Sequence, residues 1–363
     1  MKLTGWQIFW IVATVEVVMA IWLRISPAVE IAKQDAWMSM LLSCVLGGAI
    51  TYLVVKVGMQ HPGQSLTQFS QELLGSWLGK IITIPYFTAW FILSGDVLRS
   101  FADFIHLVLL DQTPVWVLMV MILGAAIYLT STSGITGIGR FCEIAGPVTI
   151  ITLLVSLLLN ISNAKWRSLL PVMGDASLKE IISASLAPSS FLGESFMLLV
   201  LLSFLSNSKH ILKKTMASVW MTGIMLIITT IMVLMVFGTA VAQELRFPYF
   251  MLVRSINILN FIQNLDILVI FIWIFGVFAK ISLYLFMTSY EMGQWFRIKS
   301  WKRMMWFSAP VIFIIALSIP NEATIMLLQK FWETIAIPVC AIAIPLCLWI
   351  VTSAKRKLVK TDQ

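Results

Sequence analysis

Several ionisable side chains of this sequence lie in the middle of long apolar stretches, where a charge is costly. Glu16, Glu194 and Lys280 each stand inside such a stretch. An ionised group at the centre of a membrane helix costs about 2.5–3.5 kcal/mol on insertion scales, so such groups face the protein interior and hold a solute, an ion or one another. The ammonium of Lys280 needs a carboxylate from another helix, and the sequence leaves both Glu16 and Glu194 open as its partner.

A further group of charges lies on one face of a predicted helix. Asp96, Arg99 and Asp103 follow one another at spacings of three and four residues, which makes them neighbours on an α-helix. Two interpretations stay open. The cluster either neutralises itself for structural reasons or belongs to a ligand site.

No arrangement for catalysis accompanies these charges. His61, His106 and His210 are scattered, and the sequence contains no nucleophile–base pair, phosphate-binding loop or cofactor fingerprint. The four cysteines have the spacing of neither a metal site nor a disulfide framework. We therefore expect a protein that is not an enzyme and that holds no metal and no cofactor.

The composition says which elements must position the charges. Hydrophobic residues make up 60% of the 363 residues and charged residues only 12%, whereas a soluble domain carries about 25% charged residues. The apolar runs are continuous and long enough to cross a bilayer as helices, which argues against a barrel. The sequence predicts an all-α integral membrane protein with ten transmembrane helices, at 5–29, 37–57, 81–109, 114–131, 141–160, 178–206, 215–241, 265–293, 305–320 and 332–352.

The basic residues predict the orientation of these spans. With a cytoplasmic N-terminus, fifteen Lys and Arg fall in cytoplasmic segments and eight in external segments, and Arg99 and Lys280 lie within spans. This asymmetry predicts that both termini are cytoplasmic. It also accounts for the net charge of +8, so we expect a lipid bilayer and no nucleic acid as the partner of the basic residues.

Two amphipathic connections suggest an internal repeat. Residues 66–78 join the second and third spans, and residues 247–265 join the seventh and eighth. These positions are equivalent if the single transmembrane domain, 1–363, consists of a five-plus-five inverted repeat, as in many secondary transporters. The repeats would be 5–160 and 178–352, followed by a cytoplasmic tail at 353–363.

The sixth span carries the strongest sign of a binding site. Pro188, Ser189, Ser190 and Gly193 interrupt it just before Glu194, and broken helices at membrane depth offer free backbone groups to a solute. A simple proline kink is the alternative. The first span, its repeat mate, should be discontinuous near Glu16, although no Gly or Pro stands there. The predicted ligand-binding residues are Glu16, Val18, Met19, Phe101, Ser189, Ser190, Phe191, Gly193, Glu194 and Lys280, with Phe101 and Phe191 as apolar gates.

Six segments together resemble the spore germination permease family, the B subunits of nutrient germinant receptors. They are KQDAW (33–37), HPGQSLTQFSQELLG (61–75), WRSLLPV (166–172), FLGES (191–195), FPYFMLVRSINILNFIQNLD (247–266) and WIFGVFAKISLYLF (273–286). The similarity runs along nearly the whole chain. Members often carry small residues near the break in the first span, where this chain has Val17, Val18 and Met19.

The resemblance implies a fold of the amino acid–polyamine–organocation transporter superfamily. It also implies a multi-pass protein of the spore inner membrane that recognises a small germinant, often an amino acid. Its expected partners are a larger membrane A subunit, thought to form the ion-conducting part, and a lipoprotein C subunit. A proton- or cation-coupled amino-acid transporter is the alternative function, and a structural partner with an inactive pocket is a third.

Overall fold

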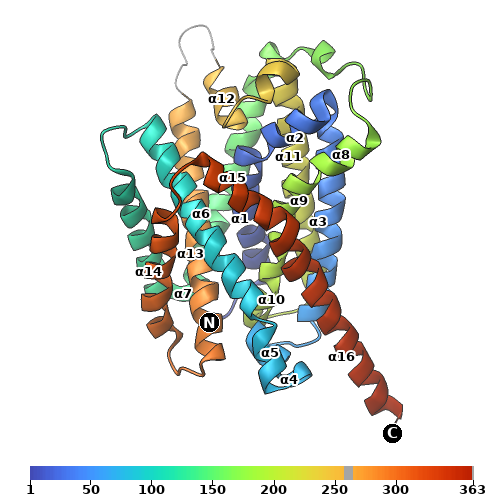
Figure 1. Ribbon diagram of the computed structural model, residues 1–363, viewed down its shortest axis with the longest axis vertical. Helices are drawn as coiled ribbons and strands as arrows, with labels where there is room; N and C mark the ends of the chain where they lie inside the picture. Colours follow the sequence, from blue (N-terminus) through green and yellow to red (C-terminus); the bar gives the residue numbers. More distant parts are fainter. Residues whose placement is uncertain (257–264, 362–363) are drawn as a thin grey trace.

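The computed structural model describes residues 1–256 and 265–361 and shows a bundle of helices (Figure 1). Within these residues the β-pairing consists of one isolated bridge between Leu3 and Leu205. The first half of the chain contains α1 (Gly5–Leu23), α2 (Ile25–Ala32), η1 (Lys33–Asp35), α3 (Ala36–Gly58), α4 (Leu66–Leu74), α5 (Ser76–Ile81), α6 (Ile84–Val108), α7 (Val115–Leu159), η2 (Ile161–Asn163) and η3 (Trp166–Leu169). The second half contains α8 (Leu178–Ala184), α9 (Leu186–Leu192), η4 (Gly193–Met197), α10 (Leu198–Leu201), η5 (Leu202–Phe204), α11 (Ile211–Ala242), α12 (Pro248–Arg254), α13 (Asp266–Trp295), α14 (Trp301–Leu317), α15 (Glu322–Phe331), η6 (Trp332–Ala336), η7 (Pro338–Ala343) and α16 (Ile344–Thr361).

The long helices make this a multi-pass membrane protein. Among the described residues, 8 helical stretches are long and apolar enough to cross a membrane. The predicted fourth and fifth spans are two helices that meet at Gly134, where the backbone leaves helical geometry (φ 57°, ψ −151°), and the label α7 covers both. Their 45 residues rise about 68 Å in total at 1.5 Å per residue, enough for two crossings of a ~30 Å core. The 17-residue α14 is about 26 Å long and lies where the ninth span was expected. The count of ten stays a prediction.

The first span is interrupted, but not where we expected. Helix α1 runs unbroken past Glu16 and ends at Leu23, and α2 begins after Arg24, whose φ is −114° and ψ −3°. The absence of Gly and Pro between residues 15 and 21 explains why the helix continues there. The break therefore lies about two turns beyond Glu16, at a charged residue.

The sixth span is interrupted in a milder way than predicted. From Leu178 to Phe204 it changes from α8 and α9 to the 3₁₀ segment η4 and on to α10 and η5, and Gly193 keeps helical angles (φ −77°, ψ −11°). The hydroxyls of Ser189, Ser190 and Ser195 are near enough to donate to backbone carbonyl oxygens three or four residues earlier. Such bonds compete with the helix backbone and bend it, and Pro188 removes one further backbone donor. The result is a tightened helix rather than an unwound one.

The two interrupted spans lie at the centre of the bundle. The most apolar part of α1 is 83% buried and that of the sixth span 94% buried, and α3, α11 and α13 pack around them. Figure 1 shows both chain ends at the same end of the bundle as α4 and α5, with α2, α8 and α12 at the opposite end.

The structure describes the first amphipathic connection in full, and the second connection and the C-terminal tail only in part. The predicted helix at 66–78 is present as α4 and α5, and the beginning of the second connection as α12. Residues 257–264 of that connection lie outside the described residues. The tail expected from residue 353 continues α16 as far as Thr361. The inverted repeat itself stays a prediction.

Candidate functional site

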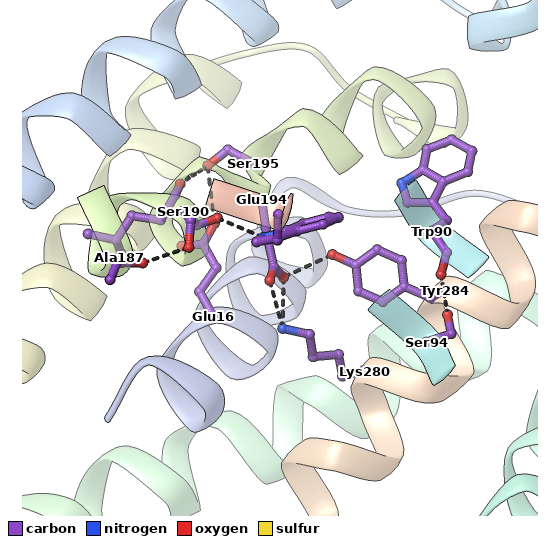
Figure 2. Close-up of polar contacts among 11 residues, drawn as sticks. Glu16, Trp90, Ser94, Ala187, Ser190, Glu194, Ser195, Lys280 and Tyr284 are labelled. Atoms are coloured by element: carbon purple, nitrogen blue, oxygen red, sulfur yellow. Dashed lines mark hydrogen bonds and ion pairs between the residues drawn. The ribbon is translucent and has the colours of Figure 1, made fainter. Parts of the chain in front are cut away.

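A buried ion pair lies where the sixth span meets α13. The ammonium nitrogen of Lys280 is 2.8 Å from Oε2 of Glu194, and the Tyr284 hydroxyl donates to the same carboxylate oxygen over 2.9 Å (Figure 2). Helix α13 places Lys280 and Tyr284 one turn apart, on the same face. Lys280 is 1% exposed and Glu194 is fully buried. Of the two carboxylates that the sequence left open, Glu194 is the partner of Lys280.

Glu16 joins this pair through a neighbouring hydroxyl. The Ser195 hydroxyl, next in sequence to Glu194, shares its proton between the Leu192 carbonyl oxygen at 2.8 Å and Oε1 of Glu16 at 3.1 Å (Figure 2). The Thr51 hydroxyl of α3 in turn donates to Ser195 over 2.7 Å. Glu16 is fully buried, and its Oε2 has no hydrogen-bond partner among the described residues. Because a buried carboxylate needs several donors, Glu16 is the least satisfied member of this polar cluster. The cluster links α1, α3, η4 and α13.

A second ion pair lies at the break in the first span. Arg24 is 2% exposed, and its Nη1 is 2.8 Å from Oε1 of Glu333, in the π-helical segment η6. The Phe191 ring centroid lies 4.4 Å from Cζ of Arg24 and 4.9 Å from Nζ of Lys280, within the range of a cation–π contact. Phe191 therefore connects the two ion pairs. Arg24 is one of the eight basic residues that the topology count assigned to external segments, and the pair with Glu333 holds it inside the bundle rather than in an exposed loop.

Two small cavities flank the interrupted helices. One, of 20 Å³, lies between α1, α7, α12 and α13 and is lined by residues that include Val18, Trp22, Tyr249 and Trp273. The other, of 10 Å³, is lined by Phe191 together with two charged side chains, those of Arg24 and Asp96. Each has room for about one water molecule. The structure is therefore a closed packing that must open to admit a solute.

The bulky side chains of the first span have a counterpart on α13. A Cβ atom added at Gly276 would lie 2.1 Å from Cγ2 of Val18, far inside van der Waals contact. Gly276 thus provides the close approach between α1 and α13. The small residue expected on the first span stands on the eighth instead.

The structure brings some of the predicted site residues together. Glu16, Glu194, Lys280 and Phe191 form or adjoin the polar cluster. Val18 lines the larger cavity, and Phe101 stacks on Trp273, which also lines it, with 5.5 Å between ring centroids.

Other predicted residues lie apart from the cavities. Met19 is buried in the hydrophobic core, and Gly193 packs against Ile50 and Ile337. Ser189 and Ser190 use their hydroxyls on their own helix, and the Ser190 carbonyl accepts a hydrogen bond from the Trp332 indole over 3.3 Å. A ligand-binding role for these four residues stays a prediction.

The predicted charge cluster of α6 divides in two. Nε of Arg99 lies 2.9 Å from each carboxylate oxygen of Asp103, so these two form a local pair four residues apart. Asp96 lines the smaller cavity with Arg24. Arg99 and Asp103 thus neutralise each other, as one of the two interpretations predicts. For Asp96, a role in a ligand site stays a prediction.

Sequence reasoning missed several members of the site. Tyr284 follows Lys280 by one helical turn and Ser195 follows Glu194 directly, so local spacing alone would have pointed to both. The residues around Arg24 and Glu333 gave no such signal, because the two partners are 309 residues apart in the sequence. Thr51 gave no such signal either.

Comparisons with known proteins place the chain in a family. The sequence profile described as "Spore germination protein" matches residues 2–325. Three similar relatives come from Bacillus subtilis (strain 168). Spore germination protein YndE is 25% identical over 89% of this chain and 88% of its own length, spore germination protein KB is 23% identical over 83% and 81%, and spore germination protein A2 is 22% identical over 89% and 88%.

Solved structures of a transporter share the fold. Mhp1, a nucleobase-cation-symport-1 family transporter, in a closed conformation with bromovinylhydantoin bound, matches with a TM-score of 0.60 and 16% identity over 91% of this chain and 74% of Mhp1. The inward-facing conformation of Mhp1 gives a TM-score of 0.56 and 14% identity over 94% of this chain and 76% of Mhp1. Family and fold are thus those of permeases and transporters. The chain belongs to the spore germination protein family and has an Mhp1-type transporter fold.

Proposed function

We propose that the chain is the membrane subunit of a nutrient germinant receptor. It binds a small germinant, an amino acid as the first candidate, near the middle of the spore inner membrane and triggers germination together with an A and a C subunit. The observation that carries the proposal is the buried polar cluster of Glu16, Glu194, Lys280 and Tyr284, at the junction of both interrupted spans and α13. Charged groups at this depth mark solute and ion sites in membrane proteins.

The cluster suggests how binding is reported. Hydrogen bonds and an ion pair between side chains connect the sixth span to α1, α3 and α13. A solute that competes for one of these side chains therefore changes how the helices pack. A solute shifts the balance between two packings only by as much as its affinity for them differs. The closed packing has little room for a solute, so the germinant would favour an opened one. The partner subunits would read the difference.

Deletion and complementation test the proposal. Spores that lack this chain are exposed to a panel of amino acids, sugars and ions, and the response is compared after return of the original chain or of Glu194→Gln. We expect the response to one class of nutrient to disappear on deletion and to return only with the original chain. An exposed-site variant, Lys179→Gln, serves as the control and should restore it fully. An unchanged response to every nutrient after deletion would contradict the receptor role.

A proton- or cation-coupled amino-acid transporter is the second candidate. It is favoured by the Mhp1-type fold and by the unsatisfied carboxylate of Glu16, a group suited to hold a coupling cation. Uptake of radiolabelled amino acids into proteoliposomes that contain this chain alone separates the two functions. The receptor proposal predicts no concentrative uptake, and uptake that follows an imposed proton or sodium gradient would replace it.

A further inference from the structure

The smaller cavity, between the α1–α2 break, α6, the sixth span and α15, is lined by one basic side chain, Arg24, and one acidic side chain, Asp96. We propose that Arg24 receives the carboxylate of an amino-acid zwitterion there and Asp96 its ammonium group. Glu333 is then a resident carboxylate that the ligand displaces. This inference rests on the proposed germinant-binding function and names the class of ligand and the residues that recognise it.

Arg24 has the unused hydrogen-bonding capacity that such a ligand requires. Both hydrogen bonds that it makes to described residues leave from Nη1, to Glu333 over 2.8 Å and to Gln329 over 3.4 Å. Its Nε is buried and has no partner among the described residues. A guanidinium binds a carboxylate best through two parallel N–H groups. The pair with Glu333 therefore uses only part of the fork, and a free carboxylate that engages Nε as well would be held better.

Glu333 stands on a segment that is able to release it. It is the more exposed partner, at 19% against 2% for Arg24. Its segment η6 is a π-helix, and a second π-helical segment, η7, follows. π-Helical turns are rare and occur frequently at functional sites. A local return of this segment to α-helical geometry would rotate Glu333 and Trp332 relative to Arg24, which is the movement that displacement of Glu333 requires.

The remaining walls complement the rest of an amino acid. Asp96, 7% exposed, contributes a carboxylate to the cavity. Apolar wall is provided by Leu93, Phe191 and Trp332, which would contact a small uncharged side chain. The site therefore favours a ligand with both charges, because an amine alone does not engage the Arg24 guanidinium and a carboxylic acid alone does not engage the Asp96 carboxylate.

Phe191 connects this cavity to the polar cluster. Its ring lies within cation–π distance of both Arg24 and Lys280, and the residue itself belongs to the interrupted sixth span. A ligand that moves Arg24 or opens the cavity at Phe191 therefore disturbs the environment of the Lys280–Glu194 pair. This contact gives ligand binding a direct path to the helices that the partner subunits would sense.

Binding to the purified full-length chain in lipid nanodiscs tests the inference. The probes are a mixture of neutral L-amino acids, the amines that lack their carboxylate, and the carboxylic acids that lack their amino group, each measured by thermal shift and then by calorimetry. Glu333→Gln removes the competing carboxylate and should tighten amino-acid binding about tenfold or more, whereas Arg24→Lys should weaken it about 10- to 100-fold. Asp96→Asn should weaken binding of amino acids and leave the weak binding of carboxylic acids unchanged. Arg167→Gln, at an exposed site in η3, is the matched control.

The outcomes separate this inference from the receptor role. Failure of both the original chain and Glu333→Gln to bind any amino acid would overturn the zwitterion site, as would equal binding of amines. Tighter binding by Glu333→Gln supports it and excludes a merely structural role, because loss of a structural ion pair weakens binding. If amino acids bind as described but spores that lack the chain respond normally to every nutrient, the receptor role fails and the site stands.

Discussion

Replacement of Lys280 by methionine should destabilise the protein strongly, because it leaves the Glu194 carboxylate buried without its cation. Glu194 is fully buried and Lys280 is 1% exposed, so water does not take the place of the lost partner. Breaking a buried pair on one side costs about 3–5 kcal/mol. Glu194→Gln should cost a similar amount, because it leaves the ammonium unpaired, although the Tyr284 hydroxyl retains an acceptor.

The double variant measures the coupling free energy between Lys280 and Glu194. Methionine at 280 and glutamine at 194 together leave no uncompensated charge, so most of the loss should be recovered. We expect a coupling free energy of more than about 3 kcal/mol between the two sites, because each single variant loses about 3–5 kcal/mol and the double variant should keep less than half of their sum. Equilibrium unfolding of the purified chain in mixed detergent micelles measures it, with the fluorescence of the 15 tryptophans as the signal.

A matched ion pair on α6 provides the control. Arg99 and Asp103 are 2.9 Å apart but only half-buried, at 19% and 20% exposure, and water-accessible pairs at this helical spacing contribute about 0.3–0.5 kcal/mol. The cycle of Arg99→Met and Asp103→Asn should therefore show little coupling. A coupling at Lys280–Glu194 no larger than this control would refute our reasoning that the pair is a desolvated, mutually dependent unit.

Three further predictions concern packing, capping and response. Gly276→Ala should cost about 1–3 kcal/mol because the added methyl would lie 2.1 Å from Cγ2 of Val18. Thermal unfolding should show this loss, and Val18→Ala in the same chain should recover part of it, because Cβ of residue 18 stays 2.9 Å from the added methyl. Glu291→Ala removes the carboxylate that accepts hydrogen bonds from two backbone N–H groups at the start of α4, so hydrogen exchange in α4 should accelerate about 5- to 30-fold for a loss of about 1–2 kcal/mol. Unchanged exchange would show that water replaces the cap. Gly193→Val should abolish the nutrient response while the protein remains in the spore membrane, because its neighbours already lie 3.2 Å from an added Cβ; a persisting response would favour a structural partner with an inactive pocket.

Sequence reasoning located the charges of the site because their cost in lipid is local information. Glu16, Glu194 and Lys280 stand out against apolar neighbours whatever the fold. The same reasoning found that the sixth span is interrupted, since Pro and Gly act on their own helix. It overstated the unwinding, because Gly193 keeps helical backbone angles and the span passes from α-helix to 3₁₀-helix there.

The position of the first break depended on a distant partner. Arg24 is drawn into the bundle by Glu333, and nothing in the residues around Arg24 indicates that pairing. The fit of Val18 against Gly276 is likewise a property of two helices that meet only in the folded chain. Helix content and buried charge could thus be predicted from local cost, whereas the break, the cavities and the close approach follow from long-range packing.

Exchange of the subunit tests the receptor role most directly. This chain is placed in spores in place of the related subunit of a receptor with a known nutrient preference, and germination is measured against a panel of amino acids, sugars and ions. Our account predicts that the preference changes to that of the receptor from which this chain comes, because the chain holds the germinant. A preference that stays unchanged, with the exchanged chain present in the membrane and germination intact, would show that another subunit recognises the nutrient and would contradict our account.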